Sequence, residues 1–466
     1  EIHAMTFSVL WHRDLEVWNL RSPFYPILFV FPIQWLLSAV GVTDPRVLIF
    51  SGRMIVTGFS LLNVWFVFKI GTNLWKKYAP AVLAAVFLAF NRLHIVMGSA
   101  EEPRTVASTF LLICFWILIS RSGLLWAAVA GFALGIGSAL RFGEALFLVP
   151  MAIQLIIEKR SRDLLVAVLF AGIAWILVLG PGDLLYWNEP FYSLRNMIEF
   201  TVVKRLSSTG YQPIWTYLTI APVVTDLFTI GLFFYSLRLR PWKPALWCLV
   251  PLLFLCFFQT KSERYLVPLL PFFLLCVGLG AWDLIKRATY WTPKLQLLVL
   301  FILLGAFVFE LEGFRSRSPR EAIDIVQDLA TRFELQDLMM EDVNLNGTKL
   351  YVPPTVNMIN IDSEKLSEPN YFRHFVRRKE AQYILLKTES IRIFELEKLL
   401  KARGFQEIPS AGADPKYRLF KRKPESSERL LPGVPCAILL SYARRSLSAG
   451  ASASCRQPPT RPLRAG

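Results

Sequence analysis

Long apolar runs separated by short charged loops are the feature of this 466-residue sequence that most restricts its fold. Hydrophobic residues make up 54% of the chain and charged residues only 18%, and the mean hydropathy is +0.44. A water-soluble chain of this length needs a more polar surface than such a composition supplies. The sequence therefore predicts a polytopic α-helical membrane protein, with the lipid bilayer as its first partner.

The apolar runs predict about ten visible transmembrane helices. They lie near 24–42, 47–68, 78–98, 105–120, 123–140, 145–157, 164–180, 213–236, 244–258, 265–285 and 295–311. The first of them contains Pro26 and Pro32 and is followed only by TDPR. It is therefore predicted to be a re-entrant or interfacial element instead of a full span.

Basic residues set the predicted orientation. The net charge of +16 arises largely in short loops between apolar runs: KIGTNLWKK (69–77), EKRSRD (158–163), RLRPWK (238–243) and KRATYWTPK (286–294). Such loops stay in the cytoplasm, so the charge does not indicate binding to nucleic acid. The outer side then receives residues 1–23, 99–104, 141–144, 181–212, 259–264 and everything after 312.

The composition changes after the last apolar run. Residues 1–312 form the predicted multi-span domain, and 313–424 are predicted to form a small α/β domain on the outer face. PREAIDIVQDLATRF and IFELEKLLKARGF have helical periodicity, whereas TKLYVPP, AQYILLK and KYRLFKR alternate as strands do. Residues 425–466, rich in Arg, Ser, Ala and Pro, are predicted to be a disordered or non-native tail.

Charges also lie where spans reach the outer side. The run FLCFFQTKSERYLVPLLP (254–271) places three charged residues between two apolar segments. Such residues can simply anchor a loop among lipid headgroups. Other predicted outer loops are charged as well, however: EEPRT (101–105), LRFGEA (140–145) and the loop with Arg195, Glu199, Lys204 and Arg205. Charges gathered on one face fit an enzyme that holds a phosphorylated lipid while a carboxylate deprotonates a polar acceptor.

This chemistry assigns substrate-binding roles within the charged run. Lys261 and Arg264 are predicted to grip the donor phosphate, and Glu263 to orient one of them. Tyr265 is predicted to cover the sugar or lipid edge, and Arg21 is a further cation for the phosphate.

Aromatic and acidic residues complete the candidate site. Trp18 and Trp215 can stack on sugar rings or belong to an interfacial aromatic belt. Glu101 and Glu102 are candidate catalytic carboxylates. The outer loops lack a His/Cys cluster with ligand spacing, so no metal and no cofactor are predicted, although the two adjacent glutamates could hold magnesium.

Three stretches resemble, in the same order, motifs of the Alg9/PIG-B-like mannosyltransferases, which are glycosyltransferase family 22 of the GT-C type. LRSPFYPILF (20–29), preceded by Trp18, resembles the "WE…RSYLFP" element. NMIEFTVVKRLSSTGYQPIWTYLT (196–219) resembles "N…FN…G…HPWHWY". TKSERYLVPLLP (260–271) resembles "HKEERFLFPVLP", although the family's His and first Glu fall on Thr260 and Ser262.

The resemblance implies a GT-C fold and a lipid-phosphate sugar donor. It also implies an acidic pair in the first outer loop that supplies the general base. Glu1, a candidate catalytic residue, would be the second member of this pair, with the base immediately before it, so the sequence is expected to be truncated at the N-terminus and to lack the first span; Asp14 and Glu16 are the fallback carboxylates. SAEEPRTVASTFLLI (99–113) is similar to the second acidic loop of the protein O-mannosyltransferases and lipid A aminoarabinose transferases. Their RYLLP element is also close to RYLVP here.

The sequence thus predicts a glycosyltransferase, in the first place a mannosyltransferase. It would transfer a sugar from a polyprenyl- or dolichyl-phosphate donor to a glycan or glycolipid acceptor. The expected location is the endoplasmic reticulum membrane or the bacterial inner membrane, with the active site on the luminal or periplasmic side. One alternative is a related GT-C transferase that uses another lipid-linked sugar. The other is a transporter or flippase, which should show internal repeats and charges near the bilayer midplane.

Overall fold

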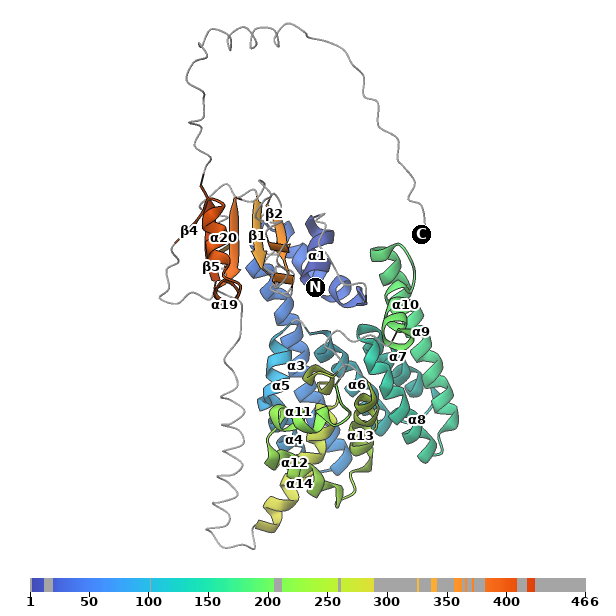
Figure 1. Cartoon of the computed structure of the whole chain (residues 1–466). Coiled ribbons are helices and arrows are strands. Elements are labelled where there is room, and N and C mark those ends of the chain that lie inside the picture. Colours follow the sequence, from blue (N-terminus) through green and yellow to red (C-terminus); the bar gives the residue numbers. More distant parts are fainter. Residues whose placement is uncertain are drawn as a thin grey trace, which may run out of the picture.

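The computed structural model shows a mostly helical body followed by a small sheet (Figure 1). It describes residues 2–11, 20–100, 102–204, 212–258 and 261–288, and then the segments 325–326, 337–341, 356–362, 365–366, 371–372, 382–408 and 417–423. The first half of the body consists of α1 (Ile2–Trp11), η1 (Pro26–Val30), α2 (Phe31–Ala39), α3 (Pro45–Trp75), α4 (Tyr78–Phe90), α5 (Arg92–Ser99), α6 (Pro103–Ser120) and α7 (Leu124–Leu140). The second half consists of η2 (Phe142–Phe147), α8 (Leu148–Ile157), α9 (Ser161–Trp187), α10 (Tyr192–Ile198), η3 (Glu199–Val203), α11 (Thr216–Val224), α12 (Leu227–Leu237), α13 (Trp242–Phe257), η4 (Glu263–Leu266) and α14 (Leu270–Ala288).

Several of these helices have the length and composition of membrane spans. Within the described ranges, α3, α6 and α9 are each long and apolar enough to cross a bilayer. Two bent pairs raise the number to five if each is one span: α4 with α5, bent by 57°, and Thr216–Pro222 with α12, bent by 112°. The structure thus confirms a helical body with several apolar helices, and the count of about ten spans stays a prediction.

The span predicted at 265–285 corresponds to α14, which is not among the described helices that are long and apolar enough to cross a bilayer. The remaining predicted spans are shorter or not described. Those predicted at 123–140, 145–157 and 244–258 are apolar helices of fewer than 18 residues. The re-entrant or interfacial element expected at 24–42 is the short apolar helix Pro26–Ala39, which at about 1.5 Å per residue is too short to span a bilayer. The span predicted at 295–311 lies outside the described residues.

Side-chain caps decide where the spans turn. The Asp44 carboxylate accepts a hydrogen bond of 2.8 Å from the Arg46 main-chain N–H, and Pro45 occupies the first helical position of α3. The break between α4 and α5 is at Asn91, whose side chain accepts a hydrogen bond of 3.1 Å from the His94 N–H. Because this cap starts α5 afresh, the chain can bend by 57° there.

Small residues let α7 and α9 pack closely. Gly131 and Gly135 have the spacing typical of tightly packed membrane helices. A Cβ atom at position 131 would lie 2.0 Å from the Ala167 carbonyl oxygen, and one at position 135 would lie 2.6 Å from that of Ala171. The two backbones can therefore approach this closely only because both positions are glycine.

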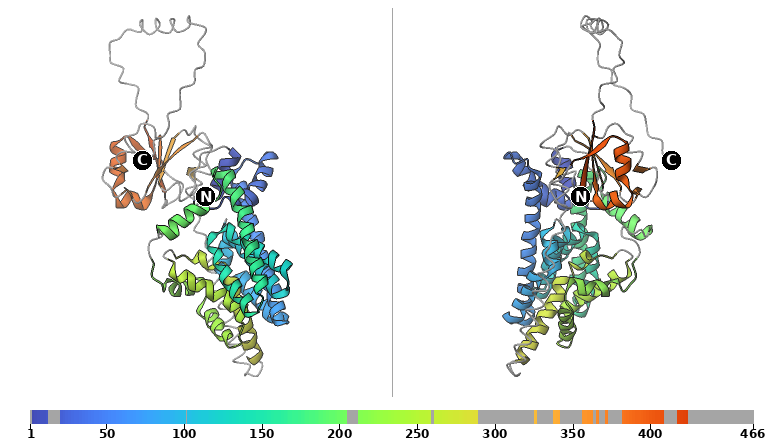
Figure 2. Two further views of the ribbon diagram at one scale, coloured as in Figure 1. Left: turned by 90° about the vertical axis from the view of Figure 1, so that its right-hand side faces the viewer. Right: turned by 60° about the vertical axis from the view of Figure 1, so that its left-hand side comes forward.

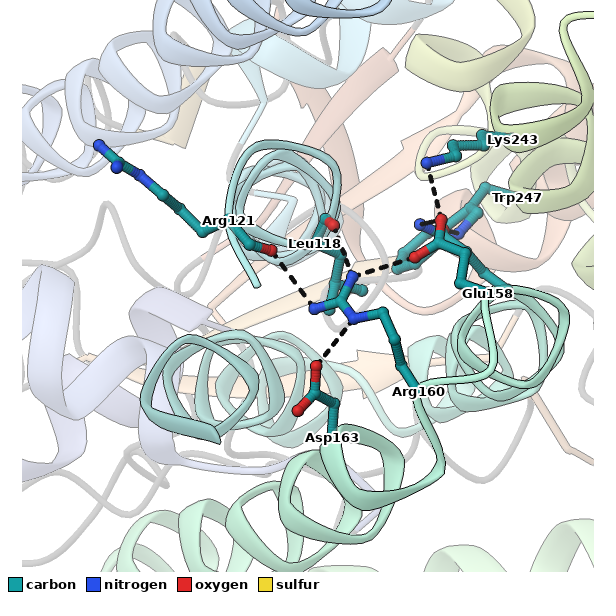
Figure 3. Close-up of polar contacts among 8 residues, drawn as sticks. Leu118, Arg121, Glu158, Arg160, Asp163, Lys243 and Trp247 are labelled. Carbon is teal, nitrogen blue, oxygen red and sulfur yellow. Dashed lines mark hydrogen bonds and ion pairs between the residues drawn. The ribbon is translucent and has the colours of Figure 1, made fainter. Parts of the chain in front are cut away.

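An ion-pair network joins the helices at the end of the body where α6 finishes (Figure 3). The Arg160 guanidinium donates to Asp163 at 2.8 Å, to Glu158 at 3.0 Å and to the Leu118 carbonyl at 3.1 Å. Glu158 also pairs with Lys243 on α13 at 2.7 Å. The predicted cytoplasmic loop EKRSRD is thus held against α6, α9 and α13 by directional contacts.

The C-terminal part is a five-stranded sheet in the order β2-β1-β3-β5-β4. Its described elements are β1 (Asp337–Glu341), β2 (Asn357–Ile361), β3 (Tyr383–Lys387), α19 (Thr388–Ile393), α20 (Leu396–Ala402), β4 (Phe405–Ile408) and β5 (Tyr417–Arg422). Strands β1, β2 and β3 are parallel, and β5 runs antiparallel to β3 and β4. Figure 2 shows this sheet at the end of the helical body opposite to the end of α14.

The small sheet was foreseen only in part. The strands predicted in AQYILLK and KYRLFKR are β3 and β5, and the helix predicted in IFELEKLLKARGF contains α20. The strand predicted in TKLYVPP lies outside the described residues, as does most of the helix predicted in PREAIDIVQDLATRF. Strand β1 was missed, because DLMME has no polar-apolar alternation and four of its five residues are buried.

Gly131→Ala should destabilise the body. The added methyl group meets the Ala167 carbonyl, so we expect the free energy of unfolding to fall by about 2 kcal/mol and the Tm in detergent to fall with it. Gly172→Ala in α9 is the matched control, because a Cβ atom there has no neighbour within 4 Å. Equal Tm values for the two variants would contradict the close approach of α7 and α9.

Candidate functional site

Glu102 is the centre of a buried cluster of charges. It lies in the loop between α5 and α6, where its N–H donates to the Ala100 carbonyl at 2.8 Å, and its side chain is only 9% exposed. Three guanidinium groups lie near its carboxylate: Arg104 at 3.5 Å, Arg141 at 3.8 Å and Arg264 at 4.0 Å. These arginines come from α6, from the end of α7 and from η4.

Arg21 contributes a fourth positive charge to the field at Glu102. We call Arg21, Arg104, Arg141 and Arg264 the arginine cage. Burial tends to raise the pKa of Glu102, but the four arginines outweigh this effect, so the pKa of its carboxyl is lowered. The carboxylate is therefore firmly ionised at neutral pH.

Burial also shifts the pKa of Arg141 in the cage and of the neighbouring Glu144. Burial, followed by the positive charge of Arg104, lowers the pKa of Arg141 to about 10 despite the opposing effect of Glu102. The pKa of Glu144 in η2 shifts the other way, because burial raises it more than Arg104 and Arg141 lower it. Cationic charge thus remains in excess around Glu102.

Hydrogen-bonding capacity is left unused inside the cage. Arg104 stacks on the Tyr265 ring, with its guanidinium carbon 4.0 Å from the ring centroid. Its Nε atom forms the 3.5 Å ion pair with Oε1 of Glu102, but neither of these buried atoms, nor the buried Oε1 of Glu144, has a hydrogen-bond partner among the residues that the structure describes. Charged groups in such a state are costly unless something else satisfies them, so the cage is suited to an anionic or polar ligand.

Close packing of α6 against α7 brings the cage together. A Cβ atom at Gly137 would lie 3.2 Å from the Ala107 carbonyl oxygen. Arg141 follows Gly137 by one helical turn, and Arg104 precedes Ala107 by about one turn. The two arginines therefore face Glu102 from neighbouring helix ends.

The residues predicted from the charged run 254–271 have different surroundings. The Lys261 ammonium is buried and donates to the main-chain carbonyls of Gln212 at 2.9 Å and Phe258 at 2.7 Å. Glu263 is exposed, and its carboxylate forms no ion pair within the described ranges. The carboxylate beside Arg264 is Glu102.

The remaining candidates are dispersed. Trp215 is exposed at the start of α11. Glu1, Trp18 and Glu101 lie outside the described residues. Glu102, Arg21, Arg264 and Tyr265 are the predicted site residues that meet at the cage.

Sequence reasoning did not select Arg104, Arg141 or Glu144. The two charged loops that contain them, 101–105 and 140–145, are predicted to lie on the same side of the membrane. No motif spacing links residues 104 and 141, however, and only the packing of α6 on α7 makes them neighbours. The available signal was that each lies at the end of an apolar run on the same predicted side.

The fold is similar to that of solved membrane glycosyltransferases. ArnT from Cupriavidus metallidurans in the apo state is 12% identical with a TM-score of 0.61, and the match covers 91% of this chain and 94% of that chain. The same protein bound to undecaprenyl phosphate gives 12% identity and a TM-score of 0.58, with 91% and 98% covered. The oligosaccharyltransferase of Archaeoglobus fulgidus tethered with an acceptor peptide is 9% identical with a TM-score of 0.57, and the match covers 91% of this chain and 69% of that chain.

These likenesses define the class of the protein as a GT-C fold. The chain belongs to the Alg9-like mannosyltransferase family, whose sequence model matches residues 16–342. No curated protein sequence matches it. The resemblance found in the sequence is thus confirmed, and the protein is a glycosyltransferase and an integral membrane protein.

Glu102→Gln should destabilise the protein strongly. The change keeps the shape of the side chain but leaves four guanidinium groups without their shared negative charge. We expect the free energy of unfolding to fall by about 3 kcal/mol, measured as a Tm shift in detergent at pH 7. Glu263→Gln is the matched control, because this glutamate is exposed, and its Tm should equal that of wild type.

Wild type and Glu102→Gln can also be compared as a function of pH. Because folding lowers the pKa of Glu102, its contribution to stability is complete above the pKa of an unfolded glutamate and is lost as the pH falls through the lower folded value. The Tm gap between wild type and Glu102→Gln should stay constant above about pH 6 and narrow in acid below about pH 4. A gap that widens in acid would contradict this assignment.

Proposed function

We propose that the protein transfers mannose from a polyprenyl- or dolichyl-phosphate donor to a glycan or glycolipid acceptor outside the cytoplasm. Membership of the mannosyltransferase family supports the choice of sugar. The arginine cage carries the proposal of a phosphate donor, because three guanidinium groups lie within 4.0 Å of Glu102, Arg21 adds a fourth positive charge, and only Glu102 and Glu144 oppose them. The likeness in fold to ArnT with bound undecaprenyl phosphate agrees with it.

The reaction needs cations at one point and a base at another. The acceptor hydroxyl oxygen attacks the anomeric carbon while the bond from that carbon to the phosphate oxygen breaks. The hydroxyl proton passes to a carboxylate base, and the lipid phosphate leaves with one more negative charge than it had in the donor. Cations fixed beside the phosphate stabilise the charge that develops there. Arginine is well suited, because its planar fork can bind two phosphate oxygens.

Within the cage, we assign the phosphate to Arg264 and Arg141. The Arg264 side chain is 46% exposed and that of Arg141 is 19% exposed, whereas Arg104 is buried against Tyr265. The first two can therefore meet a ligand at the open side of the cage. Arg21, which acts on Glu102 through its charge, adds to the positive field at the phosphate.

Glu102 then acts by holding the arginines in place. A carboxylate with a lowered pKa, paired with several cations, is a poor proton acceptor at neutral pH. The base is left to the other carboxylates predicted from sequence, Glu1 and Glu101. Lys261, whose ammonium is bound to two main-chain carbonyls, would fasten the loop before α11 to η4 and leave the phosphate to Arg264.

The acceptor would bind at the outer face of the protein. Trp18 and Trp215 would stack on sugar rings, and Trp215 is exposed in the way such a contact requires. The 313–424 domain would help to select or position the acceptor. The active site would face the lumen of the endoplasmic reticulum or the bacterial periplasm. A lipid-linked sugar other than mannose is the second candidate, because the likeness to ArnT extends over 94% of that chain.

A donor assay tests the function directly. Purified protein, in a form that includes any native N-terminal residues, should release polyprenyl or dolichyl phosphate from the mannosylated lipid without a nucleotide sugar. Parallel reactions with aminoarabinose- and glucose-carrying lipids separate mannose from the second candidate. Turnover with GDP-mannose and none with any lipid donor would refute the proposal.

Arg264→Lys tests the role of the cage. Lysine keeps the charge but loses the planar fork, so we expect kcat with the lipid donor to fall at least about tenfold while Tm stays near wild type. Arg287→Lys is the control, because Arg287 is an equally charged, exposed residue paired with Asp283 at the end of α14. Near-wild-type turnover of Arg264→Lys would mean that Arg264 only anchors its loop among headgroups.

A further inference from the structure

A stripe of polar residues on α3 points at the loop that carries Glu102. Thr57, Ser60 and Asn63 are spaced by three residues, so they follow one slanting stripe of the helix. The helix around them is apolar enough to cross a bilayer. We call these three residues the α3 ladder.

Two members of the ladder bind α5, which leads into the loop. The Thr57 hydroxyl has two acceptors at 3.0 Å, the Gly98 carbonyl of α5 and the Arg53 carbonyl of its own helix. The Ser60 hydroxyl is hydrogen-bonded to Nε2 of the buried His94 at 2.8 Å. A Cβ atom at Gly98 would lie 2.5 Å from the Ser60 hydroxyl oxygen, so the absence of a side chain at position 98 permits this close approach.

The third member binds α6, which leads out of the loop. The Asn63 side-chain amide donates to the Thr105 carbonyl at 3.0 Å and accepts from the Thr109 hydroxyl at 2.6 Å. Asn63, Thr105 and Thr109 are all buried. The Thr105 hydroxyl in turn donates to the Met97 carbonyl at 3.1 Å, which joins α6 directly to α5.

We propose that the α3 ladder consists of positioning residues that fix the height of the Glu102 loop and of the start of α6 along α3, and so hold the arginine cage in its active arrangement. The ladder grips both helices that bound this loop, within a few residues on either side. Apolar packing between membrane helices resists separation but sets their axial position weakly, whereas a hydrogen bond is directional and short. This inference rests on the proposed function, because it gives the cage a catalytic purpose.

The distances within the cage make the site sensitive to such a shift. The arginine nitrogens lie 3.5 to 4.0 Å from the Glu102 carboxylate. Arg104 and Glu102 move with the start of α6, whereas Arg264 and Arg141 belong to other elements. A slide of α6 by a fraction of a turn would therefore separate the two pairs. A misplacement of about 1 Å can cost an enzyme about a hundredfold in rate.

The test compares two paired variants on the same two helices. Asn63→Leu with Thr109→Val removes the ladder bond to α6 and orphans neither partner, since the Thr105 carbonyl keeps its helical N–H. Asn73→Leu with Ser120→Ala is the control, because Asn73 donates to Ser120 between α3 and α6 at their other end. Thr109→Ser is the conservative variant that keeps the hydroxyl.

Three measurements on the full chain in detergent decide the outcome: Tm, kcat with the mannosylated lipid phosphate, and hydrogen exchange of the Glu102 and Thr105 amides. Both paired variants should lower Tm to a similar extent. The ladder variant alone should lose about tenfold in kcat and exchange these two amides faster, while Thr109→Ser should behave as wild type.

Equal kcat losses in the two paired variants, or equal exchange, would overturn the positioning role. The exchange comparison does not depend on the donor. If wild type transferred no sugar from any lipid phosphate, the proposed function would fail, and exchange would still decide whether the ladder holds the loop.

Discussion

The rest of the site depends on the attraction between the buried Glu102 carboxylate, which lies between α5 and α6, and the arginine cage. Four guanidinium groups from separate segments would repel one another if they were gathered in a poorly hydrated space. The Glu102 carboxylate offsets that repulsion, and the pKa of its carboxyl is lowered because the four arginines together outweigh the opposing effect of burial. One side chain thereby joins the start of α6, the end of α7 and η4.

Two kinds of contact hold the helices of the surrounding body together: close apolar packing and directional polar contacts. Glycine and alanine bring α7 against α9 and α6, and this packing fixes which helices are neighbours. Polar bonds then fix how far each helix lies along the next. They are found at the cage, along the α3 ladder and in the Arg160 network where α6 ends. Such a division suits a site built at the ends of helices that are otherwise apolar.

The sequence predicted the features that depend on local chemistry. The apolar run 164–180 lies within α9, and AQYILLK contains β3, because hydropathy and strand propensity act over a few residues. The role of Glu102 as the centre of a cage could not be read in this way. It depends on Arg141, which is 39 residues away and reaches Glu102 only because Gly137 lets α7 approach Ala107. The surroundings of Lys261 were equally hidden, because its acceptors are main-chain carbonyls that no side-chain pattern reveals.

The bend at Asn91 has a consequence for the depth of the site. If α4 runs along the bilayer normal, the eight residues of α5 rise by about 6 Å after a bend of 57°, where a straight continuation would rise by about 12 Å. In that orientation the Glu102 loop would be recessed toward the lipid and would not project into water. A phosphate carried on a lipid chain could then reach the cage at the level of the neighbouring headgroups, with its hydrocarbon still in the membrane. The tilt of one short helix would in this way decide how far a substrate has to rise out of the bilayer before it can react.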